Sequence, residues 1–246
     1  MLVSASMRIA VLSDIHANVP ALDAVLAHAG SVDGIWHLGD VVGYGPDPDG
    51  VIDRLRAAGA HGVRGNHDAA AAGGSEIDWF NPDARRAMEW TRTAISSTSV
   101  EWLRALPERR RLEGCDLVHG SPRQPLWEYV TSPALARDNM ELLDERIGLH
   151  GHTHIPVAWV QHGTEIEGQS PREGAELKLE GRRALVNPGS VGQPRDGDPR
   201  ASYMVLDPAS GAMTWHRVAY DVEAVQAAMR AAGLPSFLVS RLSVGL

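Results

Sequence analysis

Five short motifs contain most of the residues in this chain whose types and spacing suit chemistry. They are Ser-Asp-Ile-His (13–16), Gly-Asp (39–40), Gly-Asn-His-Asp (65–68), Val-His-Gly (118–120) and Gly-His-Thr-His (151–154). Each places a carboxylate, an imidazole or an amide oxygen beside a glycine or at the end of an apolar run. Together they supply seven nitrogen and oxygen metal ligands and one further histidine for proton transfer. This inventory suits two divalent ions that share a carboxylate, an arrangement that attacks phosphate esters.

Two of the motifs repeat one spacing. Asp14 and His16 lie two residues apart, and so do His152 and His154. In an extended segment, such a pair presents both side chains on one side, where they can bind one ion. Glycines beside the ligands allow the backbone to turn tightly around it. A single Asp-x-His or His-x-His pair is more often an ordinary group of polar residues at the surface or in the core. The prediction therefore rests on all five motifs together, which all fall at the ends of expected strands.

Two further oxygen ligands follow predicted strands. Asp40 ends its strand, and its two carboxylate oxygens could bridge two ions. Asn66 offers a neutral carbonyl oxygen, which holds an ion without adding charge that would repel an incoming phosphate.

Alternating strands and helices position these residues. Strands are expected at 8–13, 34–38 and 61–64, with helices at 21–29 and 48–58. The alternation indicates a sheet with helices on its faces. Sites in such sheets gather at the carboxyl ends of the strands, which is where Asp14, Asp40 and Asn66 are placed.

Residues 69–105 interrupt this alternation with helical apolar spacing. We interpret them as a helical insertion that lies over the site, or else as a packed helical pair without contact to substrate. Beyond it, further strands are expected at 112–117, 147–149, 157–161, 177–179, 184–186, 203–206 and 213–218, with helices at 132–143 and 221–232. The polar stretch 163–174 is expected to be a loop. Without a long linker or an internal repeat, residues 1–246 are predicted to form a single domain.

Composition excludes several classes of protein. At 246 residues and 43% hydrophobic, the chain can bury a core, yet it has no apolar run long enough for a membrane span. A basic region typical of a signal peptide is also missing. The single Cys115 excludes an internal disulfide and a thiolate-rich metal site, so a cytoplasmic location is expected. A net charge of −8 disfavours general nucleic-acid binding.

The ordered motifs resemble those of the calcineurin-like metallophosphoesterase superfamily. The resemblance rests on Asp14-x-His16, Gly39-Asp40, Gly65-Asn66-His67-Asp68, His119 and Gly151-His152-x-His154. The stretches 39–46, 119–123 and 187–195 further resemble the small prokaryotic phosphodiesterase branch. All metal-ligand positions of the family pattern are matched, over roughly residues 8–220.

The resemblance implies an α/β fold, a four-layer α-β-β-α sandwich of two mixed sheets. It implies one ion on Asp14, His16, Asp40 and His154, and a second on Asp40, Asn66, His119 and His152. A hydroxide bridging the two ions would attack phosphorus. The resemblance further implies that His67 stabilises the phosphoryl oxygens or protonates the leaving alkoxide, and that Asp68 orients His67. The ligand types suit Mn, Fe or Zn.

Three residues are candidates for binding substrate. Arg123 and Arg195 offer the planar paired donors that phosphate favours, and Tyr44 lies four residues after the shared carboxylate. Surface ion pairing or turn structure is the alternative for each. The tryptophans are expected mostly in the core or the insertion, although Trp127 is a candidate to flank a ring of the substrate.

These observations predict a dinuclear metal-dependent phosphoesterase acting on a small phosphodiester or nucleotide-type substrate. The alternatives are a phosphomonoesterase or protein phosphatase of the same superfamily, and a non-catalytic metal-binding scaffold. Protein phosphatases of the superfamily have Gly-Asp-x-x-Asp-Arg-Gly where this chain has Gly-Asp-x-x-Gly-Tyr-Gly (39–45), which lacks their arginine. A scaffold would tend to lose His67 or a ligand. The sequence does not indicate the oligomeric state.

Overall fold

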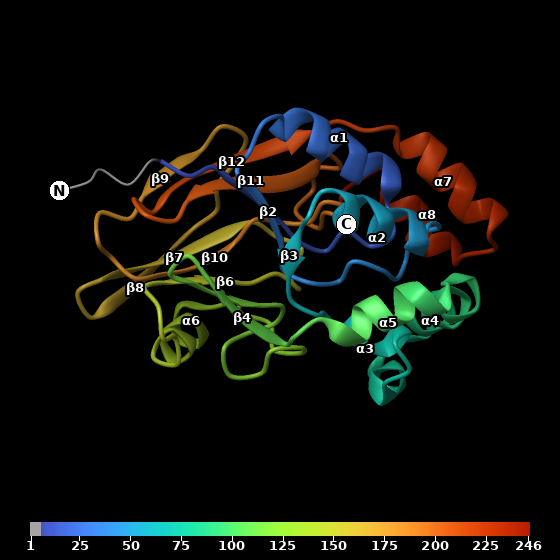
Figure 1. Cartoon of the computed structure of the whole chain (residues 1–246), viewed down its shortest axis with the longest axis horizontal. Coiled ribbons are helices and arrows are strands. Elements are labelled where there is room, and N and C mark those ends of the chain that lie inside the picture. The colour runs from blue at the N-terminus through green and yellow to red at the C-terminus, as the bar shows by residue number, and fades with distance from the viewer. Residues whose placement is uncertain (1–5) are drawn as a thin grey trace.

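Two six-stranded mixed sheets form the centre of the molecule in a computed structural model that describes residues 6–246 (Figure 1). The strand order is β3-β2-β1-β11-β12-β9 in the first sheet and β4-β5-β6-β10-β7-β8 in the second. The strands are β1 (Ile9–Leu12), β2 (Gly34–His37), β3 (His61–Gly62), β4 (Arg109–Leu112), β5 (Cys115–Val118), β6 (Ile147–Leu149), β7 (Val157–His162), β8 (Glu165–Gln169), β9 (Glu176–Lys178), β10 (Ala184–Asn187), β11 (Ala201–Asp207) and β12 (Ala212–Val218).

Helices cover the outer faces of both sheets (Figure 1). They are α1 (Val19–Ala29), α2 (Pro48–Ala57), α3 (Asn66–Ala71), α4 (Pro82–Ala94), α5 (Ser97–Ala105), α6 (Pro133–Met140), α7 (Val222–Ala231) and α8 (Ser236–Arg241), with a 3₁₀ turn, η1, at Ser75–Trp79. Side-chain caps define several helix starts. Asn18, Asp47 and Ser132 each accept a hydrogen bond from the backbone N–H three residues on.

Alternation along each strand divides the core into layers. In β1, Ile9 and Val11 pack toward the second sheet, whereas Ala10 and Leu12 pack under the helices on the outer face. The second sheet covers its own outer face with α6, around Met140 and Leu185. The result is the predicted four-layer α-β-β-α sandwich of two mixed sheets, which is confirmed.

Each sheet contains three neighbouring parallel strands, which bring their carboxyl ends to one edge. β1, β2 and β3 pair in parallel in the first sheet, and β5, β6 and β10 do so in the second. The five motifs follow five of these strands: Asp14 after β1, Asp40 after β2, Asn66 after β3, His119 after β5 and His152 after β6. The topology therefore delivers ligands to one place from both sheets.

The structure differs from the sequence analysis at several elements. The strand expected at 112–117 is interrupted by a turn at Glu113 and Gly114, both with positive φ, which joins β4 to β5 in a hairpin. The polar stretch 163–174 contains β8, which forms a second antiparallel hairpin with β7. Helix α3 begins at Asn66, before the insertion predicted at 69–105, and α8 was not predicted.

Within residues 6–246, no helix has the length and apolarity that crossing a bilayer would require.

The packing between the sheets makes a stability prediction. Leu149→Ala removes a fully buried side chain from the layer between the sheets, and we expect the free energy of unfolding to fall by about 2–5 kcal/mol. Leu142→Ala is the matched control, since Leu142 is 50% exposed, and it should change stability by less than about 0.5 kcal/mol. Denaturant titration of both variants measures the difference. Equal losses would contradict the assignment of Leu149 to the core.

Candidate metal centre

Asp14, His16, Asp40 and His154 form a first group of potential metal ligands. One ligand atom of each lies within 4.8 Å of the others, and all four residues are buried. Asp14 divides its carboxylate between two tasks. Its Oδ2 accepts hydrogen bonds from the Ser13 hydroxyl and the His152 amide. Its Oδ1 faces His154 Nε2 at 3.3 Å and has no hydrogen-bond partner, which leaves it available to an ion.

Asp40, His119 and His152 form a second group under the same 4.8 Å limit. Asn66 joins it, because its Oδ1 lies 3.0 Å from His119 Nε2. His152 presents Nδ1 to the cluster, 3.0 Å from the same nitrogen. The structure thus brings together all seven residues predicted as ligands, in the two groups expected from the family resemblance.

Asp40 belongs to both groups through a single oxygen. Its Oδ2 lies 3.7 Å from His16 Nε2 and 3.4 Å from His119 Nε2. Its Oδ1 instead accepts a hydrogen bond from the His67 backbone amide at 2.9 Å. The oxygen that faces both groups is thus Oδ2, and the use of both oxygens as a bridge between two ions stays a prediction.

The imidazoles are oriented as metal ligands. Nδ1 of His16, His119 and His154 lies 2.6–3.1 Å from the carbonyl oxygens of Val42, Leu38 and Gln193 respectively. A carbonyl oxygen can only accept, so each Nδ1 carries the hydrogen. In a neutral ring, this directs the Nε2 lone pair inward, as in metal-binding histidines.

The close approach of His16 Nε2 and His154 Nε2 indicates whether a cation fits between them. His16 Nε2 and His154 Nε2 lie 3.1 Å apart, and burial lowers the pKa of both histidines well below the ordinary value. Two neutral rings with Nδ1–H engaged face each other with lone pairs only, which repel. A divalent ion between these nitrogens and the carboxylates removes the repulsion, so the donor set fits a divalent metal site.

The carboxylates also suit a cation. Burial, together with the nearby Asp40 charge, raises the pKa of Asp14 to about 6. Burial acts on Asp40 in the same direction, but the facing imidazoles of His119, His67 and His16 outweigh it and hold its pKa below the ordinary value. A bound divalent ion would favour the ionised form of both groups.

Backbone conformation, rather than extended strand geometry, aims the paired ligands. Asp14, His16, Asp40, His152 and His154 all have φ between 50° and 68°, a left-handed conformation that is unfavourable for non-glycine residues. The prediction that the Asp-x-His and His-x-His pairs share a side because they are extended is therefore wrong. Hydrogen bonds between loops hold them instead, such as the Asp14 amide to the Gly39 carbonyl and the His16 amide to the Asp40 carbonyl.

Glycine is required where two of these loops touch. A Cβ at Gly65 would collide with the Asp40 carboxylate and amide, and one at Gly151 would collide with the Ser13 hydroxyl. These close approaches bring the ligand loops of different strands together.

His67 lies beside the ligands without belonging to either group. Its ring stacks on Phe80, with ring centroids 4.4 Å apart, and contacts Tyr44 at the same separation. Burial lowers the pKa of His67 to about 4, so that the ring is neutral at pH 7. Its Nδ1 has no hydrogen-bond partner.

Asp68 does not orient the His67 ring, and that prediction is wrong. Its Oδ2 accepts from the Gly65 amide at 2.9 Å and its Oδ1 from the Val42 amide at 3.1 Å. Asp68 thus caps the start of α3 and fastens the loop after β2 to it. It positions the Asn66 and His67 backbone instead.

A cavity of about 100 Å³ opens over both groups. Arg195 and Tyr44 line it, with the guanidinium 5.9 Å from the Tyr44 ring centroid. Gln193 fixes Arg195 through a hydrogen bond of 2.8 Å from Nη2. The helical insertion also reaches the cavity, through Trp79, Phe80, Asn81 and Ala84.

Arg123 lies outside this cavity. Its guanidinium pairs with Glu128, with Nε 3.1 Å from Oε1, and stands 3.6 Å from the Asp138 carboxylate. Sequence proximity to His119 suggested a role in binding phosphate, but the turn at 121–124 directs the side chain to the surface, where it forms ion pairs.

The comparisons with known proteins identify the family. A model of the calcineurin-like phosphoesterase superfamily domain matches residues 7–211. The chain belongs to this superfamily. It is therefore an enzyme of the metallophosphoesterase class, whose members hydrolyse phosphate esters, and its Asp and His cluster is the expected place for a divalent metal.

Relatives cover most of the chain. A metallophosphoesterase structure from Sphaerobacter thermophilus is 43% identical, with a TM-score of 0.90 over 98% of this chain and 100% of that one. An uncharacterized protein of Methanocaldococcus jannaschii is 34% identical over 96% of this chain and 98% of its own length. Phosphodiesterase YfcE of Escherichia coli is 31% identical over 82% of this chain and 88% of its own.

Sequence reasoning missed the aromatic residues at the mouth of the cavity. Trp79, Phe80 and Tyr129 line it together with Trp127, the one that was a candidate. Trp79 and Phe80 follow the glycines 73–74 in a stretch with no motif, and only their density of aromatic side chains could have drawn attention to them.

The metal centre makes a prediction about protons. Although burial disfavours its charged form, the Asp40 carboxylate raises the pKa of His119 to about 9. His119 is therefore protonated at pH 7 and must lose that proton to bind a metal. We expect Mn²⁺ binding to release about one proton at pH 7 and progressively fewer above pH 9. Calorimetry in buffers of different ionisation enthalpy measures this release.

His119→Asn is the matched variant, since it leaves the first ligand group intact. It should release about one proton fewer at pH 7. An unchanged proton count would show that His119 is not the group that titrates.

Proposed function

We propose that this protein is a dinuclear metal-dependent phosphoesterase that hydrolyses small phosphodiesters or nucleotide-type esters. The observation that carries the proposal is the position of Asp40 Oδ2, which faces His16 in one ligand group and His119 in the other. A carboxylate oxygen shared between two complete donor sets suits two ions better than one. The absence of thiolate ligands and the mixed imidazole, carboxylate and amide donors favour Mn, Fe or Zn.

Residues around the metal centre would each have a different role in binding the phosphate ester. Bound divalent ions supply Lewis acidity toward phosphate oxygens and a hydroxide nucleophile near neutral pH. Arg195, which Gln193 holds in place, would offer paired N–H donors to a phosphate oxygen. Among the described residues that line the cavity, no other is a lysine or an arginine. Tyr44 lies under the guanidinium and presents its ring to His16 and His67.

His67 is placed to contact the substrate directly. It lines the cavity next to Asp40, and its amide already holds one Asp40 oxygen. A neutral imidazole can donate one hydrogen bond to a phosphoryl oxygen but is a poor proton donor to a leaving alkoxide. We therefore assign His67 to stabilising phosphoryl charge.

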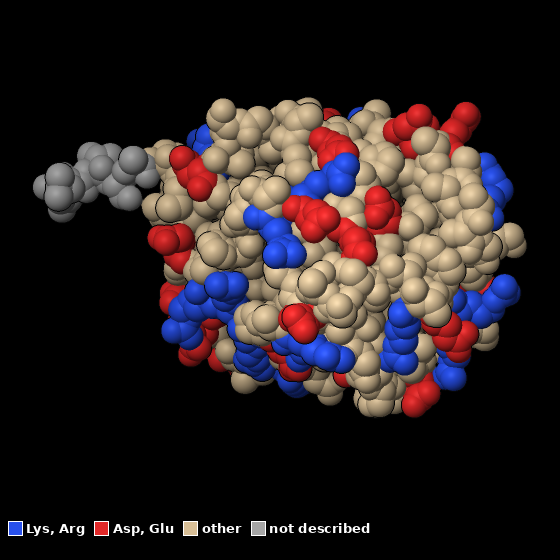
Figure 2. Space-filling view, turned by 45° about the vertical axis from the view of Figure 1, so that its right-hand side comes forward, with Lys and Arg blue, Asp and Glu red and all other residues tan. Residues whose placement is uncertain are grey.

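A small ester is favoured over a phosphoprotein. The relative YfcE is a phosphodiesterase, and Tyr44 stands in the loop where protein phosphatases of the superfamily have an arginine. The cavity volume is about 100 Å³. On the face seen in Figure 2, acidic and basic side chains are interspersed rather than gathered into a basic band. These features support a compact substrate. A non-catalytic scaffold would need neither His67 nor Arg195 at the cavity.

Metal counting tests the shared carboxylate. Asp40→Ala removes the anion between two cations and should leave less than one tightly bound Mn²⁺ per chain, whereas Asn66→Ala should leave about one. Elemental analysis after dialysis gives the counts. Asp53→Ala, which changes an exposed carboxylate on α2, should keep two. Retention of two ions by Asp40→Ala would exclude Asp40 as the bridge.

Leaving-group dependence tests His67. His67→Ala removes no ligand, so both metals should remain, while kcat should fall by about 10²–10³, as for loss of one donor to a developing oxyanion. If His67 stabilises phosphoryl charge, the loss should be equal for an alkyl ester and a nitrophenyl ester. A much smaller loss for the nitrophenyl ester would instead assign proton donation to His67, since nitrophenolate needs little protonation.

A further inference from the structure

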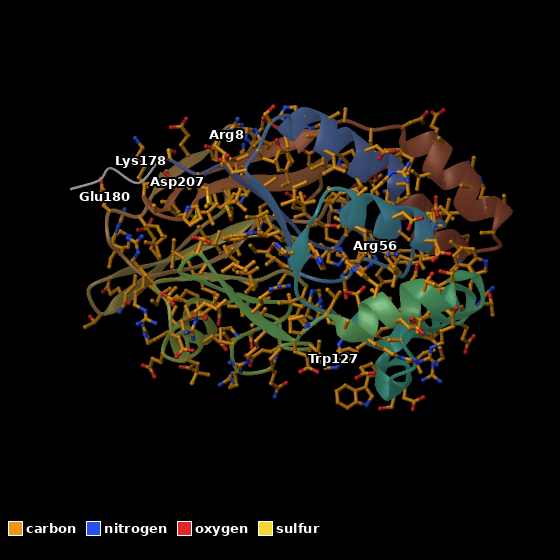
Figure 3. All side chains as sticks on the ribbon, viewed as in Figure 1. Arg8, Arg56, Trp127, Lys178, Glu180 and Asp207 are labelled. Atoms are coloured by element: carbon orange, nitrogen blue, oxygen red, sulfur yellow. The ribbon has the colours of Figure 1, made fainter. Side chains whose placement is uncertain are left out.

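Four aromatic side chains form a rim at the mouth of the metal cavity: Trp79, Phe80, Trp127 and Tyr129. Two come from the end of η1 in the helical insertion, and two from the loop after β5. The rings of Trp79 and Trp127 lie 5.1 Å apart between centroids, and Phe80 lies 5.7 Å from Trp127. Figure 3 shows Trp127 where that loop approaches the insertion. We call these four residues the aromatic rim.

The aromatic rim adjoins the metal ligands directly. Tyr129 stacks on the ring of His152, with centroids 4.0 Å apart and planes 16° from parallel. Trp127 lies 6.4 Å from the same imidazole. A group stacked on the rim would therefore lie close to an ester bound at His152 and the other ligands. A single sugar could connect the two.

Exposure shows that the rim is not simply core. The Trp79 side chain is 72% exposed and Tyr129 is 47% exposed, although an indole contributes most to stability when its large apolar surface is buried. Clustered exposed aromatic side chains at a cavity mark a binding surface more often than isolated ones do.

Charge limits what the rest of the ligand can be. Arg195 is the only Lys or Arg among the described residues that line the cavity, and Asp40, a metal ligand, is the only Asp or Glu. One arginine with the metal centre suits a single phosphate ester. The rim has no charged side chain of its own, so it suits an uncharged planar group beside that phosphate.

We propose that the aromatic rim stacks the nucleobase of a nucleoside phosphodiester while the metal centre binds its phosphate. The proposal rests on the phosphoesterase function above and specifies its substrate class. Every nucleobase offers a flat π face, and stacking on exposed tryptophan is tolerant of base identity. Trp79 and Trp127 already contact each other, so the base stacks on the outer face of the pair rather than between the two rings.

A structural clasp is the competing role for the pair, because it joins the insertion to the loop after β5. A clasp would affect stability and would act on all substrates alike. The test therefore compares two diesters that share the phosphate chemistry: the methyl ester of adenosine 5′-monophosphate, and glycerophosphoglycerol, which has no ring. Hydrolysis of both by the Mn²⁺-loaded enzyme is followed by phosphorus NMR.

We expect Trp79→Ala and Trp127→Ala each to lower kcat/KM for the adenosine diester by about 5-fold to 150-fold, mainly through KM. The value for glycerophosphoglycerol should change by less than about 2-fold. Phe237→Ala is the control, since it removes another exposed aromatic ring, 56% exposed on α8 and absent from the cavity lining. Phe237→Ala should leave kcat/KM for both diesters unchanged. Trp79→Phe should recover most of the loss.

Equal losses for both diesters would assign the pair to a clasp and overturn the proposal, as would no loss for either. If the wild-type enzyme hydrolyses neither diester, the phosphoesterase proposal fails for this class. Binding then decides the role of the rim. Calorimetry with the Mn²⁺-loaded protein compares a phosphonate analogue of adenosine monophosphate, which has an unhydrolysable P–C bond, with propylphosphonate. Tighter binding of the adenosine compound that Trp79→Ala abolishes supports the rim as a base site. Equal binding of the two compounds contradicts it.

Discussion

The crowding of buried donor atoms around Asp40 is the constraint on which the rest of this structure depends. Nitrogen lone pairs of His16 and His154 face each other at 3.1 Å, and one Asp40 oxygen faces two imidazoles. Buried polar atoms without hydrogen-bond partners are unfavourable, and Asp14 Oδ1 and His152 Nε2 at this centre have none. Divalent ions bound between these atoms would remove the repulsion, which is why the proposed reactive centre lies here.

Many backbone hydrogen bonds together stabilise the unfavourable conformations of these ligand residues. The ligands come from the carboxyl ends of parallel strands in both sheets, and hydrogen bonds between neighbouring loops hold them in left-handed conformations. Carbonyls of Val42, Leu38 and Gln193 fix the imidazole tautomers from behind. Asp68 also supports the ligand loops, because its carboxylate joins the loop after β2 to the start of α3. The proposed chemistry thus depends on supporting residues that bind no ion themselves but hold the ligand loops in place.

Sequence reasoning predicted which residues the structure brings together as potential ligands, because their motifs follow apolar strands, where local pattern and topology agree. It could not predict which Asp40 oxygen is free, since the other is held by the His67 amide across two loops. It assigned Arg123 to the substrate because of a neighbouring motif, yet Glu128 and Asp138 attract that side chain to the surface. Strand β8 was missed because its exposed polar residues hide its pairing with β7. Three of the four residues of the aromatic rim were missed because the rim forms only when the insertion folds against the loop after β5.

The central claim is that two ions share Asp40. Anomalous X-ray diffraction from crystals of the Mn²⁺-loaded protein, collected on both sides of the manganese absorption edge, tests it most directly. We expect two peaks about 3.5–4 Å apart, with Asp40 Oδ2 between them, one peak beside His16 and the other beside His119. A single peak, or two peaks that do not share Asp40, would contradict the account.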